Sequence, residues 1–187
     1  MDALIRKAVP DDAESIAHVK TRSWQAAYRG QLPDCLLDSL DQELLPRTEF
    51  WRTEISSPRS PKHEIWVAET DARVEGFVAL GPERQADPAG EIYAIYVNPH
   101  RWNQGIGRML FSRATDRLAA AGYPAAILWV LESNTRARRF YEIAGWTLDG
   151  KTKTESLPGG VQLQEVRYGF SFAPKNASKN GLKNEDS

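Results

Sequence analysis

The sequence predicts a single α/β (α+β) domain over residues 1–173, followed by a polar tail over residues 174–187. The chain of 187 residues has the usual length of one domain and is long enough to bury a core. Its apolar residues follow strand and helix periods in the order β-α-α-β-β-β-α-β-α-β-β. Twice, an apolar strand leads into a helix across a short turn. The tail is rich in Asn and Lys, which predicts disorder.

The N-terminal half begins with a short strand over residues 4–8 and a helix that runs to about Ala27. Asp11 and Glu14 have the spacing of a capping box at the start of this helix, with Asp in the role of Ser or Thr. The other elements of this half are a break at Gly30 and Pro33, a helix over about 43–55, a loop over 56–62, a hairpin of strands 64–70 and 73–80 joined by Asp71-Ala72, and a loop over 81–90.

The central segment combines a strand, a glycine pair and a helix. Residues 91–97 are apolar and rich in β-branched and aromatic side chains, which predicts a strand. Asn98-Pro99 ends it, because proline cannot donate to a strand ladder. The glycine pair at 105–107 precedes a segment over 108–121 with one apolar helical face, and Gly122 ends that helix.

The glycine pair predicts an anion site. Backbone amides without a neighbouring Cβ can approach an anion, and the free amides and dipole of a helix N-terminus favour negative charge. We therefore expect a phosphate or pyrophosphate on the amides of residues 102–108. A Walker loop is disfavoured because Arg108-Met109 replaces Lys-Ser/Thr, and a dinucleotide site is disfavoured because the third glycine is missing. Glycines that only shape the turn are the alternative.

The C-terminal part adds a buried strand over 125–131 and a helix over 134–144. Asn134 and Tyr141 are seven residues apart, which places them on one face of this helix. Taken alone, such a polar pair beside an apolar stripe indicates only the boundary of the core. The stripe consists of Ala137, Phe140 and Ala144, and the last pair of strands covers residues 146–149 and 161–172.

Residues 90–146 resemble the core of the GNAT superfamily of acyl-CoA-dependent N-acyltransferases. The matching segments are Glu-Ile-Tyr-Ala-Ile-Tyr-Val-Asn-Pro (91–99), Gln-Gly-Ile-Gly-Arg-Met-Leu (104–110) and Leu-Trp-Val-Leu-Glu-Ser-Asn-Thr-Arg-Ala-Arg-Arg-Phe-Tyr-Glu-Ile-Ala-Gly-Trp (128–146). The resemblance implies a mixed, mostly antiparallel central sheet with flanking helices. Two adjacent parallel strands of this sheet splay apart and hold the cofactor.

The resemblance also implies acetyl-CoA as the co-substrate and a role for each matching residue. Asn134 would hold the amide arm of the cofactor. Tyr141 would donate a proton to the departing thiolate, since a phenol with a pKa near 10 can serve as the acid for a thiol with a pKa near 8.5. The implied cofactor contacts are Ile95, Tyr96, Val97, Trp102, Asn103, Gln104, Gly105, Ile106, Gly107, Arg108, Asn134 and Tyr141.

The strand over 91–97 would bind the acyl group and supply the general base. Glu91 starts this strand and shares one face with the alternate residues from Tyr93 to Val97. It is the predicted general base that takes a proton from the amine, directly or through a water. In the family, a bulge in this strand frees a backbone amide for the acyl oxygen, and the next amides pair with the pantetheine arm.

One position departs from the family pattern. The phosphate loop of the family usually reads Gln/Arg-x-x-Gly-x-Gly/Ala, and Trp102 stands at its first position. A side-chain contact to phosphate from that position is therefore in doubt. Arg101 and Arg108 are the neighbours expected to supply charge instead.

The acceptor pocket in this fold is built by the first two helices, the loop between them and the last strands. Trp24 and Tyr28 are four residues apart on one helix face, and with Tyr93 they are the predicted acceptor-binding residues. Ordinary packing of the helix on the sheet is the alternative. Trp51 and Trp66 are expected in the core or at its rim.

Composition limits the class of partner. Lys and Arg number 24 and Asp and Glu 25, so the net charge of −1 gives no drive towards nucleic acid. One cysteine, Cys35, excludes an internal disulfide. The absence of a long apolar run and of a signal-peptide pattern predicts a cytoplasmic protein without a membrane span. The three histidines are scattered without the spacing of metal ligands, so no metal is expected.

The sequence thus predicts an N-acetyltransferase that transfers the acetyl group of acetyl-CoA to a primary amine of a small molecule or peptide. Direct attack in a ternary complex is expected, because the motifs supply no protein nucleophile. A non-catalytic acyl-CoA-binding domain and an enzyme for another nucleotide are the alternatives. Pairing of two copies through the last strands, as a homodimer, is common in such folds and stays open.

Overall fold

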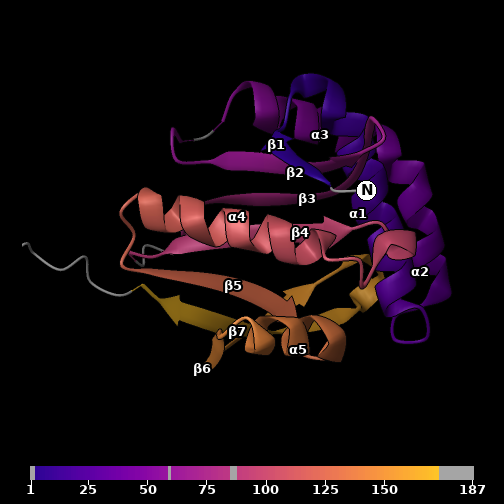
Figure 1. The fold of residues 1–187 in the computed structure, drawn as a ribbon. Helices are drawn as coiled ribbons and strands as arrows, with labels where there is room; N and C mark the ends of the chain where they lie inside the picture. The colour runs from indigo at the N-terminus through magenta and orange to yellow at the C-terminus, as the bar shows by residue number, and fades with distance from the viewer. Residues whose placement is uncertain (1–2, 59, 85–87, 173–187) are drawn as a thin grey trace, which may run out of the picture.

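The computed structural model describes residues 3–58, 60–84 and 88–172 (Figure 1). Seven strands form one sheet in the order β1-β2-β3-β4-β5-β7-β6. Neighbouring strands are antiparallel except β4 and β5, which are parallel. The strands are β1 (Leu4–Lys7), β2 (Glu64–Thr70), β3 (Arg73–Pro82), β4 (Gly90–Val97), β5 (Ala125–Leu131), β6 (Thr147–Ser156) and β7 (Gln162–Ser171). This mixed, mostly antiparallel sheet with flanking helices confirms the predicted fold class.

Helices cover both faces of the sheet (Figure 1). On one face, α4 and α5 bury a core around Leu110, Phe111 and Trp146, and on the other face α1 and α3 bury a second core around Ile16 and Trp51. The helices are α1 (Ala13–Tyr28), α2 (Asp34–Ser39), α3 (Leu44–Ser56), α4 (Ile106–Ala120) and α5 (Thr135–Ile143), and short 3-10 turns lie at Pro10–Asp12, Leu40–Glu43, Pro99–Arg101 and Pro158–Gly160.

The parallel strands β4 and β5 separate after a short contact. They pair only at Gly90, Glu91 and Ile92, opposite residues 126–128. Beyond Ile92, the edge of β4 that faces β5 has no strand partner within the described part of the chain. Backbone donors and acceptors on that edge are therefore left for a ligand.

A bulge in β4 changes the direction of its side chains. The pairing of β3 with β4 passes from Leu80–Ile92 to Ala79–Ala94, so Tyr93 is the extra residue. Ile95 consequently packs in the α4 core together with Ile92, whereas Tyr93 packs in the α1 core. The expectation that Glu91, Tyr93, Ile95 and Val97 share one face is wrong, because one extra residue reverses the alternation.

The start of α1 also differs from the prediction. Asp12, and not Asp11, closes the first turn, because its Oδ2 accepts from the amide of Val9 at 2.8 Å. Arg6 binds the same carboxylate with two nitrogens, at 2.7 and 2.9 Å. The spacing of Asp11 and Glu14 fits a capping box, but the short 3-10 turn shifts the helix start to Ala13.

The Arg6–Asp12 pair makes stability depend on acid pH. Hydrogen bonds from Arg6 and Val9 outweigh the desolvation of the Asp12 carboxylate and lower the pKa of Asp12. A lowered pKa means that this stability is present above the ordinary value of 3.8 and is lost as the pH falls through the lowered value. Asp12→Asn should cost about 1–3 kcal/mol at pH 7 and less at pH 3. Urea unfolding at both pH values measures this, and an equal cost at both would contradict it.

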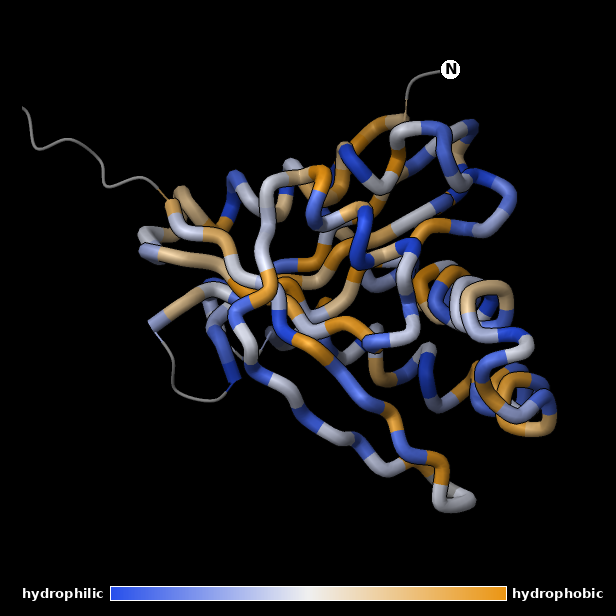
Figure 2. The backbone as a smooth tube through the Cα atoms, turned by 90° about the horizontal axis from the view of Figure 1, so that it is seen from below, coloured by the Kyte–Doolittle hydropathy of each residue, from blue (hydrophilic) through white to orange (hydrophobic). Residues whose placement is uncertain are grey.

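Two elements were missed or shortened in the prediction. The region after Gly30 contains α2, and β6 has ten residues where only 146–149 were expected. The β6–β7 hairpin projects from the body of the protein, and hydrophilic and hydrophobic residues alternate along one of its two strands (Figure 2). The predicted tail over 174–187 lies outside the described residues. No helix in the described ranges is long and apolar enough to cross a membrane.

Candidate active site

A cavity of about 380 Å³ opens where β4 and β5 separate. Its volume lies in the range of small-molecule and cofactor sites. The walls come from β4 residues 92–97, β5 residues 128–131, the end of α1, the start of α5, and the residues Trp102, Gly107, Glu155, Leu163 and Glu165. The splayed pair implied by the family resemblance is thus present and encloses a space.

The N-terminus of α4 lies at one end of the cavity. Gly105 caps the helix with a φ of 85°, a left-handed conformation that favours glycine, and Asn103 has a φ of 63°. Helix α4 begins at Ile106, two residues earlier than predicted. The first intrahelical bond runs from Met109 to the carbonyl of Gly105 at 3.1 Å. The amides of residues 106–108 are therefore free of helical partners, which fits the predicted anion site.

The side chains around this loop are arranged differently from the expectation. Arg101 turns to the buried carboxylate of Glu75, with Nε at 3.4 Å. Arg108 lines a separate depression on the outer side of α4, and Gln104 donates to the carbonyl of His100 at 2.9 Å. Neither Arg101 nor Arg108 lines the cavity. The cation that does is Arg136 of α5, a residue that sequence reasoning did not single out.

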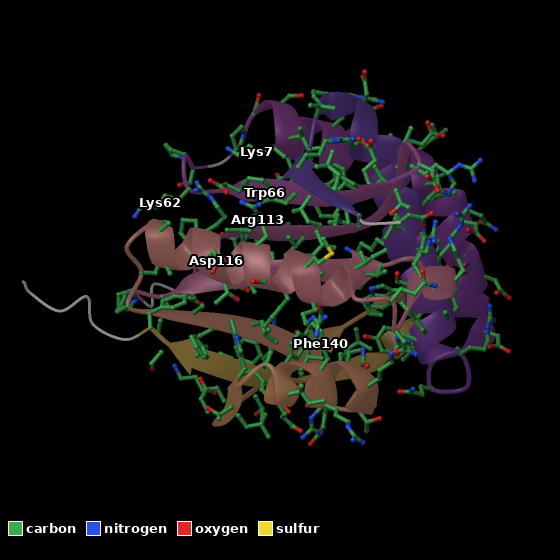
Figure 3. All side chains as sticks on the ribbon, in the orientation of Figure 1. Lys7, Lys62, Trp66, Arg113, Asp116 and Phe140 are labelled. Atoms are coloured by element: carbon green, nitrogen blue, oxygen red, sulfur yellow. The ribbon has the colours of Figure 1, made fainter. Side chains whose placement is uncertain are left out.

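Tyr141 lies in the middle of the cavity wall. Its ring packs in an aromatic cluster, and its centroid is 5.4 Å from the ring centroids of both Phe111 and Phe140. Phe140 is seen between α4 and α5 (Figure 3). The side chain is 6% exposed, and no hydrogen bond to its hydroxyl is found within the described residues. Burial raises the pKa of Tyr141 above its ordinary value, so the phenol keeps its proton.

Asn134 occupies the N-cap of α5. Its Oδ1 accepts from the amide of Ala137 at 3.0 Å, and its Nδ2 donates to the hydroxyl of Tyr28 at 3.0 Å. Asn134 thus precedes the helix, and the prediction that it lies within the helix on the face of Tyr141 is wrong in this detail. Both residues nevertheless line the cavity. The bond to Tyr28 joins the end of α1 to the start of α5.

The predicted acceptor residues also line the cavity. Trp24 donates from Nε1 to the hydroxyl of Tyr96 at 3.0 Å, and its ring meets Tyr28 edge-on at 5.0 Å. Tyr93, the bulge residue, donates to the carbonyl of Pro82. The three aromatic residues Trp24, Tyr28 and Tyr93 therefore form a wall with fixed hydrogen-bond directions. Burial raises the pKa of both Tyr28 and Tyr96, so this wall stays neutral.

Glu91 is the deepest of the predicted site residues. Its carboxylate is 1% exposed and lies in a fork of Arg84, whose Nε is 3.1 and 3.2 Å from the two oxygens. Arg84 Nη2 also donates to Glu91 Oε1, and the backbone amide of Arg84 adds a fourth bond at 3.2 Å. Glu91 itself does not line the cavity, although its neighbours Ile92 and Tyr93 do.

The remaining tryptophans are core and rim residues. Trp51 is buried against Phe77 at 5.0 Å between ring centroids. Trp66 lies at the rim, and Arg113 of α4 covers its ring at 4.8 Å (Figure 3). Within the described ranges, His, Cys, Asp and Glu form no group of three that could hold a metal ion.

The model of the acetyltransferase (GNAT) family matches residues 14–146, which is well over half of the chain. The chain belongs to the GNAT family. A relative named probable N-acetyltransferase in Mycobacterium tuberculosis is 32% identical over 169 residues, which cover 88% of this chain and 91% of the relative.

Solved structures share the fold of this GNAT chain. The PaiA N-acetyltransferase of Thermoplasma acidophilum, solved in complex with coenzyme A, matches with a TM-score of 0.73 and 21% identity over 92% of this chain and 100% of its own. The YncA protein of Salmonella typhimurium, solved with its cofactor acetyl-CoA, matches with a TM-score of 0.66 and 19% identity over 97% of this chain and 100% of its own.

The charged residues that line the cavity of this GNAT protein are segregated by sign. Arg136 lies at the end near α4, whereas the carboxylates Glu155 and Glu165 lie on β6 and β7. Glu165 pairs with Lys153 at 2.9 Å and lines the same cavity as Tyr28 and Tyr96. Sequence reasoning missed Glu155 because it ended β6 at residue 149, and it placed Glu165 in a strand without giving it a role.

Proposed function

We propose that the protein transfers the acetyl group of acetyl-CoA to a primary amine of a small molecule or peptide. The main observation behind this proposal is that one cavity contains the start of α4, with its free amides, and the protonated phenol of Tyr141. Carboxylates line another part of the same cavity. Coenzyme A is polyanionic at one end and reacts at the other. The segregation of charge in the cavity fits this ligand and an amine that arrives as a cation.

The proposed chemistry is direct transfer in a ternary complex. The neutral amine nitrogen attacks the thioester carbonyl, a C–N bond forms, and the C–S bond breaks. Tyr141 gives its proton to the departing thiolate. Backbone amides on the free edge of β4, next to the bulge at Tyr93, would stabilise the oxyanion as charge develops. No step uses a serine or cysteine of the protein.

The acceptor would enter between α1 and the β6–β7 hairpin. Trp24, Tyr28 and Tyr93 supply apolar surface there, and Glu155 and Glu165 supply negative charge. A protonated amine gains from a carboxylate in a partly desolvated site. This arrangement favours acceptors with positive charge over neutral or acidic ones.

The general base is assigned to Glu91 in this proposal. Because Arg84 holds both oxygens, a water between Glu91 and the amine would carry the proton. Glu91→Gln should lower kcat/KM by about a hundredfold, since the amide cannot take the proton of the amine. The measurement is kcat and KM for the amine at saturating acetyl-CoA.

Glu165→Gln is the matched comparison, because Glu165 is the other partly buried carboxylate near the aromatic wall. It should raise KM for the amine and leave kcat close to that of the wild type. A Glu91→Gln enzyme with the kcat of the wild type, or a loss of kcat in Glu165→Gln as large as that in Glu91→Gln, would contradict the assignment of the base.

The function itself is tested by calorimetric titration with acetyl-CoA, with desulfo-coenzyme A as the unreactive control. Saturable binding on the micromolar scale common for enzyme substrates is expected. A panel of primary amines, with thiol release as the signal, then identifies the acceptor. Binding without thiol release for any amine would favour a non-catalytic acyl-CoA-binding domain. No binding of either ligand would defeat the proposal.

A further inference from the structure

Arg136 at the cofactor end of the cavity is a cation without an anionic partner. It is the second residue of α5, and its guanidinium carbon lies 3.6 Å from the centroid of the Trp102 ring. Its Nη2 donates a long bond of 3.5 Å to Asn103 Oδ1. Throughout the described residues, no carboxylate pairs with it. Most other arginines around the site are paired, as Arg84 is with Glu91 and Arg101 with Glu75.

The position of Arg136 in the protein alone is electrostatically unfavourable. Cations are disfavoured at helix N-termini, where the dipole is positive, and acidic residues are preferred there. Neither α4 nor α5 has an acidic residue in its first turn. Partial burial lowers the pKa of Arg136, because the side of the guanidinium on the indole loses water. The positive N-termini of α4 and α5 and the unpaired cation of Arg136 thus lie close together. An anion bound between them would interact favourably with all three.

Trp102 explains why Arg136 stays at this place. Its indole Nε1 donates to the carbonyl of Val97 at 2.7 Å, which fixes the ring at the end of β4. The ring presents its face to the guanidinium, and stacking on an indole is among the strongest cation–π arrangements. Trp102 stands where the family usually has Gln or Arg. The Trp102 ring and the Arg136 guanidinium together thus take the place of that Gln or Arg side chain.

We propose that Arg136, positioned by Trp102, binds a phosphate group of coenzyme A. The inference rests on the proposed function, because it concerns the same cofactor site. Arg136, Trp102 and Gly107 all line the cavity, so the guanidinium and the first amides of α4 face one ligand from two sides. A guanidinium can give a phosphate two parallel hydrogen bonds, which backbone amides alone do not provide.

The test measures Kd by calorimetry for three ligands: coenzyme A, dephospho-coenzyme A and pantetheine. Arg136→Gln should raise Kd for coenzyme A about tenfold to a hundredfold, the range of a charge-assisted hydrogen bond. Pantetheine has no phosphate, so its Kd should not change. Arg139→Gln is the matched control, because Arg139 is an exposed residue of the same helix outside the cavity and the change in net charge is equal.

Trp102→Leu tests the positioning role. It should weaken binding of coenzyme A and not that of pantetheine, and it should add little to Arg136→Gln when the two are combined. Non-additivity is expected because Arg136→Gln removes the guanidinium and Trp102→Leu removes the ring that positions it, so both substitutions abolish the same contact with phosphate. Equal losses for coenzyme A and pantetheine in Trp102→Leu would indicate a damaged strand end and overturn the positioning role.

The ligands also identify which phosphate is bound. A loss in Arg136→Gln that is equal for coenzyme A and dephospho-coenzyme A assigns the pyrophosphate, and a loss confined to coenzyme A assigns the 3′-phosphate. An unchanged Kd for coenzyme A, or an equal loss with pantetheine, overturns the inference while wild-type binding stands. Absence of binding to the wild type instead defeats the proposed function, and the inference with it.

Discussion

Tyr141→Phe should lower kcat for acetyl transfer by about a hundredfold to ten-thousandfold, the range expected when a general acid is removed. The affinity for acetyl-CoA should stay close to that of the wild type. Phe keeps the ring that packs on Phe111 and Phe140, so the cavity wall remains. Only the proton for the departing thiolate is lost. Steady-state kinetics and calorimetry on the same preparation separate the two quantities.

The pH dependence follows from the burial of Tyr141. Burial raises the pKa of its phenol, so the acid form persists to a higher pH than that of an exposed tyrosine. The wild-type kcat should therefore show no loss from ionisation of Tyr141 up to about pH 10, the ordinary pKa of tyrosine. Tyr123→Phe is the control, because Tyr123 lies outside the cavity. A Tyr141→Phe enzyme with the kcat of the wild type would exclude Tyr141 as the acid.

The fold and the elements that form the candidate cofactor end of the cavity could be predicted because local patterns determine them. Asn98-Pro99 and the glycine pair mark the ends of β4 and the start of α4, and the spacing from Asn134 to Tyr141 marks α5. These signals lie within one strand, one turn and one helix. The sheet, the cavity between β4 and β5, and the place of Tyr141 in its wall all follow from that segment and its family resemblance.

The family resemblance implied a bulge in the strand over 91–97, but its place at Tyr93 could not be read from the residues. Nothing in the residues 91–97 distinguishes a regular strand from one with an extra residue, since both are apolar and aromatic. The bulge is set by pairing with β3, which is distant in sequence. It reverses the side-chain alternation, and this explains why the predicted common face of Glu91 and Ile95 does not exist.

The charged residues of the site were missed for a related reason. Arg136 has no local signal, because its contact with Trp102 joins α5 to the loop before α4. Glu155 lies at the cavity because β6 is a long edge strand beside β7, and Glu165 lies on a predicted strand whose neighbours in space the sequence does not show. An exposed, polar edge strand lacks the apolar pattern by which strands are recognised, so its true length is hidden in the sequence.

Gly107→Ala should stabilise the protein and weaken its cofactor binding at the same time. Gly107 is the second residue of α4, and a Cβ there would lie 3.8 Å from Val97 Cγ2 and 4.0 Å from Phe140 Cε2, which is ordinary contact. Alanine is the better helix former, so the free energy of unfolding should rise by about 0.5 kcal/mol. Because Gly107 lines the cavity, we expect the same methyl group to hold a phosphate away from the helix amides.

The loss of affinity should exceed the gain in stability. A methyl group that removes a backbone hydrogen bond to a charged phosphate should raise Kd for coenzyme A about tenfold to a hundredfold. Ser112→Ala is the matched control, because it improves helix propensity on α4 away from the cavity and should change only the unfolding free energy. Urea unfolding and calorimetry of both variants measure the two effects. Tight binding by Gly107→Ala would mean that the glycine serves the helix turn alone. If binding weakens while the protein becomes more stable, the glycine is kept for the ligand, because the fold by itself would favour alanine.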